Sequence, residues 1–270
     1  HVLVAADQQR FSLTVDLNDI VKSAKFKGSS ENEIYYDYLR KLEERRPRAE
    51  ELKKLMIEDS LQAGTYKAEL AVIDEEVAKI QAEEIKKYPK TITSMLIRAN
   101  QEIDVPPYED LEEIDRKQKQ YEYFRAHYFD QFDLNDPRAM RSGVIQQKID
   151  FYLQKLTYQV PDSQIVAMDY LLSKMDKNPE AFQYYLVHFL NESARSKRMG
   201  MDAAYVHLVD QYYAKGLATW MEKEQLDKLI SQAETLRPIL IGKTAPDLPF
   251  FKENGETITI HSIKAEYTVL

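Results

Sequence analysis

The spacing of apolar residues divides the chain into a short β-like start, a long helical middle and a β-like end. Near the start, apolar residues recur at every second position in two runs, Val2 and Val4, then Phe11, Leu13, Val15 and Leu17. Because this period indicates a strand with one buried face, we predict two strands that form a hairpin. An isolated hairpin is only marginally stable in water. We therefore expect either the tail of a preceding β domain or a flap on the helical body, with a boundary near Gly28.

The residues after Gly28 contain signals that predict helices. Ser30 and Glu33 fit a capping box, which predicts a helix that runs through about Glu44. A charged stretch from Pro47 to Tyr88 comes next, and its apolar residues are spaced alternately by four and three, at Tyr66, Leu70, Ile73, Val77 and Ile80. This is the spacing of a coiled-coil seam. It predicts a helical hairpin or a bundle face, with Gly64 bending or breaking the stretch.

Prolines and capping residues punctuate the remaining helical region. Pro89 is predicted to start a short helix to about Asn100, and Val105-Pro106-Pro107 separates two helical blocks as a candidate hinge. Later helix starts are indicated at Asp136-Pro137, Pro161-Asp162, Asn178-Pro179, and Gly200 with Asp202. The predicted helices span about 113–131, 137–157, 162–176, 179–196, 203–215 and 222–236. Short helices with short links stack as antiparallel hairpins.

The pattern changes again at Ile241. Asn254-Gly255 is a hairpin-turn signal, and the last residues, 267–270, resemble the start of a buried strand. We therefore predict a mostly α protein, a multi-helix antiparallel bundle or stacked helical hairpins with β structure at both ends. The predicted domains are a β-strand remnant at 1–28, a helical domain at 29–240 and the start of another domain at 241–270.

Composition narrows the function classes. The 270 residues carry a net charge of −8, which disfavours the phosphate contacts of nucleic-acid binders. No apolar stretch is long enough to span a membrane. The chain has no cysteine, so it contains neither disulfides nor thiolate sites.

The β-like end resembles the start of a thioredoxin-like domain. Three segments carry this likeness, 241–248 with its Gly-x-x-Ala-Pro-Asp loop, 254–260 with its Asn-Gly turn, and 264–270. The helical part is similar to the domain of unknown function that precedes such domains in exported bacterial thiol:disulfide oxidoreductases of the TlpA-like and peroxiredoxin-like (redoxin) group. Its matching stretches are 127–130, Leu134, 136–138, 161–163, 196–202, 206–208 and Trp220.

The resemblance implies a periplasmic or cell-envelope protein, often lipid-anchored upstream of residue 1, and a full-length function in thiol-disulfide exchange. Its Cys-x-x-Cys is expected about ten residues beyond Leu270. No catalytic, cofactor-binding or metal residue is assigned in this chain, and no cofactor is expected. The expected role is a non-catalytic domain that recruits a protein client or positions the redox domain. The alternative is an envelope scaffold that binds peptide or glycan through tyrosine-rich helices.

Several side chains have both a functional and a packing interpretation. His188 and Glu192 lie four residues apart and His207 follows on the next helix, so they are compatible with a metal site or with ordinary packing. The 18 tyrosines are compatible with a binding groove or with helix packing, and they cluster at Tyr35, Tyr36, Tyr38, Tyr121, Tyr123, Tyr128, Tyr212 and Tyr213.

Three further groups are expected to be structural. Trp220 is expected to pack at the end of a helix. The basic group Arg195, Lys197 and Arg198 fits the dipole at a helix end better than an anion site. The paired carboxylates are expected to be solvated, at Glu43 with Glu44 and at Glu75 with Glu76.

Overall fold

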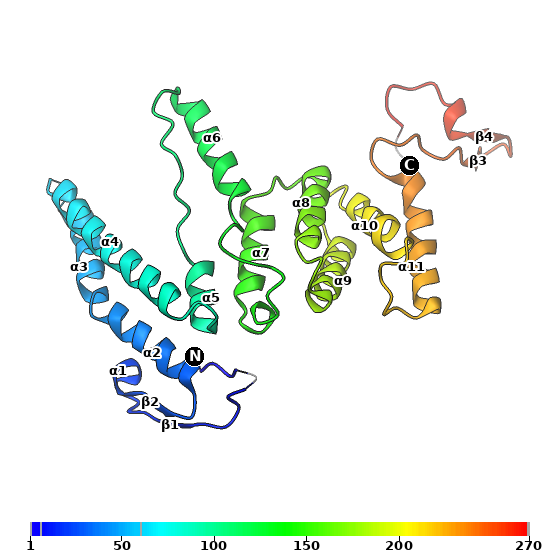
Figure 1. The fold of residues 1–270 in the computed structure, drawn as a ribbon. Coiled ribbons are helices and arrows are strands. Elements are labelled where there is room, and N and C mark those ends of the chain that lie inside the picture. The colour runs from blue at the N-terminus through cyan, green and yellow to red at the C-terminus, as the bar shows by residue number, and fades with distance from the viewer. Residues whose placement is uncertain (1, 6, 60, 269–270) are drawn as a thin grey trace. The chain divides into compact units, whose positions relative to one another are not determined.

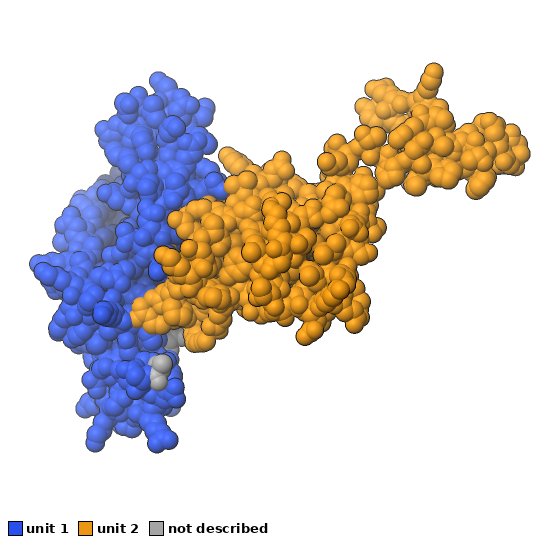
Figure 2. Space-filling view, turned by 45° about the vertical axis from the view of Figure 1, so that its right-hand side comes forward, with its two compact units in different colours: residues 1–133 blue, residues 134–270 orange. Residues whose placement is uncertain are grey.

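The computed structural model describes residues 2–5, 7–59 and 61–268. It divides into two compact units, residues 1–133 and residues 134–270 (Figure 2). The division falls inside the predicted helical domain 29–240. The boundaries predicted near residues 28 and 240 remain predictions.

The predicted fold class is confirmed. The structure is mostly helical, and a short antiparallel pair of strands lies near each end of the chain (Figure 1). Within the described part of the chain, no helix combines the length and the apolar character needed to cross a membrane.

The N-terminal strand pair differs from the predicted hairpin. Strand β1 (Ser12–Thr14) pairs with β2 (Lys25–Lys27), and Leu13 lies opposite Phe26. A short helix α1 (Ile20–Ser23) connects them, capped by the Asp19 side chain. Phe26 packs against Tyr36 of the next helix at 4.9 Å between ring centroids. The described residues near Val2 form no strand, so the predicted pairing of the two runs was wrong.

A buried asparagine holds the residues that were predicted to be the first strand. The Asn32 side chain accepts a hydrogen bond from the Leu3 amide (2.7 Å) and donates one to the Leu3 carbonyl (2.6 Å). It also donates to the Ser29 hydroxyl at 2.8 Å and is fully buried. The amide side chain thus replaces a neighbouring strand, because it pairs with both polar groups of one backbone residue.

We expect Asn32→Ala to lower the free energy of unfolding by about 1–3 kcal/mol, since it leaves partly buried backbone groups unpaired. Hydrogen exchange at the Leu3 amide should accelerate in the same variant. The control is Asn18→Ala, which removes an exposed side chain and should change stability by less than about 0.5 kcal/mol. Unchanged protection at Leu3 would contradict this role of Asn32.

Helix α2 (Ser30–Glu43) begins one residue earlier than the predicted capping box requires. Its N-cap is Ser29, whose hydroxyl accepts from the Asn32 amide, so the predicted pairing of Ser30 with Glu33 is wrong. Glu31 instead faces another helix. Both of its carboxylate oxygens accept from the Ile92 amide, at 3.1 and 3.0 Å, and so stabilise the first turn of α5 (Ile92–Ala99).

The charged stretch forms the predicted helical hairpin. Helix α3 (Arg46–Glu58) packs along α4 (Ala63–Lys87), with fully buried Leu52 between them. All five predicted seam residues of α4 are half-buried, which confirms the seam. Gly64 lies in the first turn of α4 and does not break it. The break precedes it, between Glu58 and Ala63.

The N-terminal unit ends with an extended segment and one more helix. Residues 101–107 contain no helix, and they include the predicted separator Val105-Pro106-Pro107. Helix α6 (Glu113–Ala126) follows and has no buried residue.

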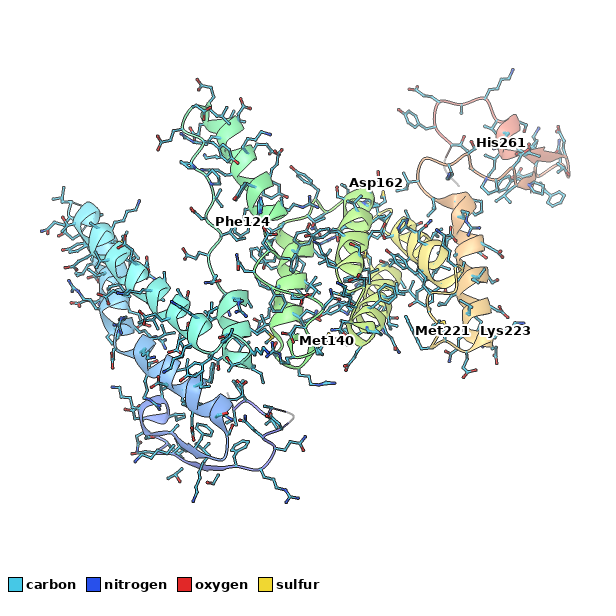
Figure 3. The ribbon with its side chains drawn as sticks, in the orientation of Figure 1. Phe124, Met140, Asp162, Met221, Lys223 and His261 are labelled. Carbon is cyan, nitrogen blue, oxygen red and sulfur yellow. The ribbon has the colours of Figure 1, made fainter. Side chains whose placement is uncertain are left out.

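The C-terminal unit is a series of short helices, each packed on the next. They are α7 (Val144–Lys155), α8 (Pro161–Ser173), α9 (Pro179–Arg195), α10 (Asp202–Leu208) and α11 (Lys223–Leu236). Side chains fill the spaces between neighbouring helices, and Asp162 marks the first turn of α8 (Figure 3). As predicted, Asn178 caps α9 by accepting from the Ala181 amide at 3.1 Å.

Two predicted helices of this unit are interrupted. The helix predicted over 137–157 is split by Gly143, whose φ of +71° a continuous helix cannot contain. Asp136 caps only the short turn before Gly143, where its carboxylate accepts from the Arg138 amide at 2.9 Å. The same carboxylate binds the Arg138 guanidinium, which holds the pKa of this carboxyl below its usual value. The helix predicted over 203–215 changes after Leu208 into a π-helical segment, Val209–Tyr213.

The Asn-Gly hairpin at the C-terminal end forms as predicted. Strand β3 (Pro249–Phe251) pairs with β4 (Thr257–Thr259), and Gly255 adopts a φ of +80° in the turn. The last predicted strand does not form over 264–268, where Tyr267 is 83% exposed and has no strand beside it among the described residues. Val269 and Leu270 lie outside the described residues.

Candidate functional site

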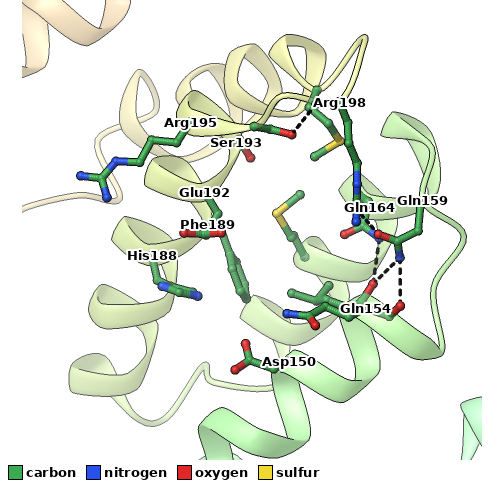
Figure 4. A pocket seen from close by; sticks show the side chains of 14 residues that line it. Asp150, Gln154, Gln159, Gln164, His188, Phe189, Glu192, Ser193, Arg195 and Arg198 are labelled. Carbon is green, nitrogen blue, oxygen red and sulfur yellow. Dashed lines mark hydrogen bonds between the residues drawn. The ribbon is translucent and has the colours of Figure 1, made fainter.

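A cavity of about 240 Å³ lies in the C-terminal unit, among α7, α8, α9 and the 196–201 segment that links α9 to α10 (Figure 4). Its mouth is formed by exposed residues of α7 and α9, among them Gln154, Glu192 and Arg195. Its floor is formed by buried residues. It is therefore an open pocket in the helical body.

Two glutamines build one wall by capping the end of α7. The Gln164 amide group donates to the Leu153 and Tyr158 carbonyls, at 3.0 and 3.2 Å. The Gln159 amide group donates to the Leu153 and Thr157 carbonyls, at 2.8 and 2.6 Å, and its oxygen accepts from the Arg198 guanidinium. Helix ends leave such carbonyls unpaired. This wall is therefore rigid, and Arg198 is engaged in it.

The floor is apolar. It consists of Met168 from α8, Phe189 from α9, and Met201, which are 4%, 1% and 8% exposed, together with Leu153 from α7. Methionine side chains are unbranched and adapt to the shape of what they contact.

The polar rim carries opposite charges. Asp150 is held by the Gln146 amide group at 2.8 Å, and His188 stacks on Tyr184 with an interplanar angle of 7°. The Arg195 guanidinium extends away from the other labelled side chains (Figure 4).

Ser193 is 4% exposed and lines the pocket. Neither its hydroxyl nor the His188 ring has a hydrogen-bond partner among the described residues. Ser193 and His188 are therefore not hydrogen-bonded to each other, and both side chains line the pocket.

The 196–201 segment, which lines the pocket, also packs closely against Pro161 and Ile241, and we call this contact at Gly200 the corner. Gly200 has a φ of +83°, and a Cβ atom there would lie 3.0 Å from the Pro161 ring and 3.2 Å from the end of Ile241. One side of the 196–201 segment thus borders the pocket. On its other side, Gly200 packs against Ile241, the first residue of the β-like segment.

The structure brings together only part of the candidate metal site. His188 and Glu192 both line the pocket, but His207 binds the Asp169 carboxylate of α8 at 2.9 Å. No group of three or more His, Cys, Asp or Glu side chains is arranged to hold a metal ion within the described ranges.

Asp169, His207 and Tyr212 form a cluster that the sequence analysis did not identify. The Tyr212 hydroxyl donates to the same carboxylate at 2.8 Å, and burial, together with this bond, raises the pKa of Tyr212. The cluster links α8, α10 and the π-helical segment. No spacing signal could have revealed it, because Asp169 lies 38 residues before His207.

The clustered tyrosines and Trp220 mainly take part in packing. Tyr36, Tyr38 and Tyr213 are buried, whereas the remaining tyrosines of the predicted clusters are half-buried. Trp220 packs edge-on against Phe182 of α9, at 6.4 Å between ring centroids.

The predicted charged groups lie at the surface. Lys197 is exposed, as are Arg195 and Arg198. Three of the paired carboxylates form ion pairs with the two arginines at the start of α3: Glu43 with Arg46, Glu44 with Arg45, and Glu76 with Arg45. Glu75 is exposed.

A second cavity, of about 390 Å³, lies in the N-terminal unit. Amide and carboxylate side chains line it, including Gln81, Asn100, Gln101, Glu102 and Gln131. Two of these amides are already engaged, Gln81 with the Tyr38 hydroxyl and Asn100 with the Leu96 carbonyl. It lacks an apolar floor like that of the first pocket, which is therefore the stronger candidate.

Comparison with known proteins identifies the family. No curated protein and no solved structure matches the chain. A family model described as a domain of unknown function, DUF5106, matches residues 75–236, which is more than half of the chain and includes the whole pocket. The chain belongs to this DUF5106 family.

Proposed function

We propose that this chain is the helical, non-catalytic part of an exported thioredoxin-like thiol:disulfide oxidoreductase, and that it recruits a protein client and positions the redox domain. The catalytic Cys-x-x-Cys then lies beyond Leu270, and residues 241–270 are the first part of the redox domain. The observation that carries the proposal is the β-like segment, in which the Gly-x-x-Ala-Pro-Asp loop at 242–247 is followed by the Asn-Gly hairpin of β3 and β4.

The geometry of the β-like segment supports this proposal. Asp247 of the Ala-Pro-Asp motif accepts from the His261 amide at 2.9 Å, which is the main reason that its pKa is lowered. The His261 ring contacts the Ala245 carbonyl at 2.8 Å. The motif is therefore folded onto the residues that follow the Asn-Gly hairpin.

The absence of cysteine from these 270 residues assigns any thiol chemistry to another segment. A cysteine at the N-terminus of a helix has its thiolate stabilised by free amides and by the helix dipole, which lowers its pKa and makes it nucleophilic. The helical part would then contribute by holding a client near that thiolate.

The alternative, a scaffold that binds peptide or glycan through tyrosine-rich helices, has less support. The buried tyrosines named above have their ring faces covered by neighbouring side chains. The other five tyrosines of the clusters are half-buried, so the clusters together offer limited ring surface for glycan stacking.

The test is made on the natural full-length protein. We expect a Cys-x-x-Cys within about 25 residues after Leu270. We also expect reduction of insulin disulfides with dithiothreitol as electron donor, and loss of this activity when the first cysteine is replaced by serine. Cell fractionation should place the protein in the envelope. A full-length protein without the cysteine pair would refute the redox assignment.

A further inference from the structure

The pocket in the C-terminal unit has features that select the class of ligand. Its volume of about 240 Å³ lies below the roughly 300–1,000 Å³ of sites that enclose cofactors and drug-sized molecules. The pocket therefore admits a single large side chain rather than a whole cofactor.

The charges at the rim cancel. Asp150 and Glu192 carry two negative charges, Arg195 and Arg198 carry two positive charges, and Arg198 is already bonded to Gln159. Binding of a phosphate group or of a strongly cationic group would leave like charges close to the ligand. The rim therefore favours a ligand group without net charge.

The wall offers an oriented acceptor. Both carbonyls that bind the Gln164 amide group fix its orientation, and its oxygen has no donor among the described residues. Gln164 is 6% exposed, so this oxygen belongs to a buried side chain that lines the cavity. The Ser193 hydroxyl and the exposed Gln154 amide complete a set that can pair with peptide N–H and C=O groups.

The floor contains two methionines and a phenylalanine, which together accept apolar groups of varied shape. Phe189 is only 1% exposed and presents little ring face on which a sugar could stack. The floor therefore fits an apolar side chain better than a glycan.

We propose that this pocket binds one large apolar side chain of an extended polypeptide, and that Gln154, Gln164 and Ser193 bond the adjacent peptide groups. An unfolded chain exposes such side chains, whereas a folded one buries them. The inference rests on the proposed function only in naming the polypeptide as a redox client.

The experiment uses the 270-residue chain with ¹³C-labelled methionine methyl groups. The probe is the capped peptide acetyl-Ser-Gly-Ser-Phe-Ser-Gly-Ser-amide, and the comparison peptide has Ala in place of Phe. We expect the Phe peptide to shift the methyl signals of Met168 and Met201. The Ala peptide should bind at least about tenfold more weakly, because it leaves the apolar floor uncovered.

A matched pair of variants locates the binding. Gln154→Trp covers the mouth of the pocket and should weaken binding of the Phe peptide about tenfold or more. Gln147→Trp makes the same change two turns earlier on α7, at an exposed position outside the pocket, and should leave binding unchanged. Both positions are exposed, so both variants should keep the urea midpoint of the parent chain.

Equal binding of the two peptides would overturn the proposal, as would equal effects of the two tryptophans. Maltotetraose is a third probe, and methyl shifts with it in the absence of shifts with the Phe peptide would assign the pocket to glycans instead. The redox assignment is tested separately, by the cysteine pair and the insulin assay. Failure of either proposal is therefore recognisable without the other.

Discussion

Replacing Gly200 by alanine is expected to lower the free energy of unfolding by about 2–4 kcal/mol. The left-handed backbone, with a φ of +83°, accounts for about 1–2 kcal/mol of this loss. Crowding accounts for the rest, because the new Cβ atom would lie 3.0 Å from the Pro161 ring, which cannot rotate away. Urea unfolding of the parent and the variant measures the difference.

Gly216→Ala is the matched control. Gly216 has a similar φ of +76°, but nothing lies within 4 Å of a Cβ atom there. Its substitution should therefore cost only the backbone part, about 1–2 kcal/mol. Adding Ile241→Ala to Gly200→Ala should recover part of the crowding cost. Equal losses for the two single variants would show that the Pro161–Ile241 corner does not constrain Gly200.

Local signals predicted some features of the fold, because a capping side chain or an Asn-Gly turn acts on residues only a few positions away. They were not uniformly reliable, since the N-cap of α2 is Ser29 and not the predicted Ser30. Asn178 caps α9, and Gly255 turns the β3–β4 hairpin, as predicted. The half-buried seam of α4 was also predictable, since its spacing follows from helix geometry alone.

Pairings between distant residues were not predictable. The alternating apolar residues around Leu13 are compatible with any partner strand. In the structure Leu13 lies opposite Phe26, because α1 reverses the chain between them. The first apolar run is instead held by Asn32, a side chain that mimics a strand. No periodicity in the sequence records such a contact.

The pocket was only partly foreseeable. His188 and Glu192 were identified as neighbours on one helix, and both line it. The Gln159 and Gln164 wall depends on where α7 ends, and Gln164 of α8 bonds the Leu153 carbonyl from 11 residues away. The basic group at Arg195 and Arg198 was predicted to serve the helix end, but Arg198 reaches across to Gln159.

Two adjacent tyrosines of the π-helical segment are expected to respond in opposite ways to loss of their hydroxyl groups. The Tyr213 side chain is fully buried, and its hydroxyl has no hydrogen-bond partner among the described residues. Replacing an unpaired buried hydroxyl removes a desolvation cost, so Tyr213→Phe should leave stability at pH 8 unchanged or raise it by about 1 kcal/mol. Tyr212→Phe removes the donor to Asp169 and should destabilise the protein by about 1 kcal/mol, since that carboxylate is partly exposed.

Alkaline pH provides a second test of the buried Tyr213 hydroxyl. Burial raises the pKa of the Tyr213 hydroxyl from 10.0 to about 12, and nearby Tyr205 adds to this increase. A raised pKa means that the folded state favours the protonated hydroxyl. Ionisation of Tyr213 therefore costs no stability below pH 10, and stability falls as the pH rises from 10 to about 12. A pKa difference of about two between the folded and unfolded states corresponds to about 2–3 kcal/mol in the free energy of unfolding.

Urea unfolding at pH 8 and at pH 11 measures this linkage. The parent chain should lose stability between the two values, and Tyr213→Phe should lose about 1 kcal/mol less, because one unit above the unfolded pKa corresponds to that amount. If Tyr213→Phe destabilises the protein at pH 8, its hydroxyl has a partner that holds the π-helical segment in place. If the variant and the parent lose the same stability at pH 11, Tyr213 ionises without unfolding the segment, and the buried hydroxyl is not the source of alkaline sensitivity.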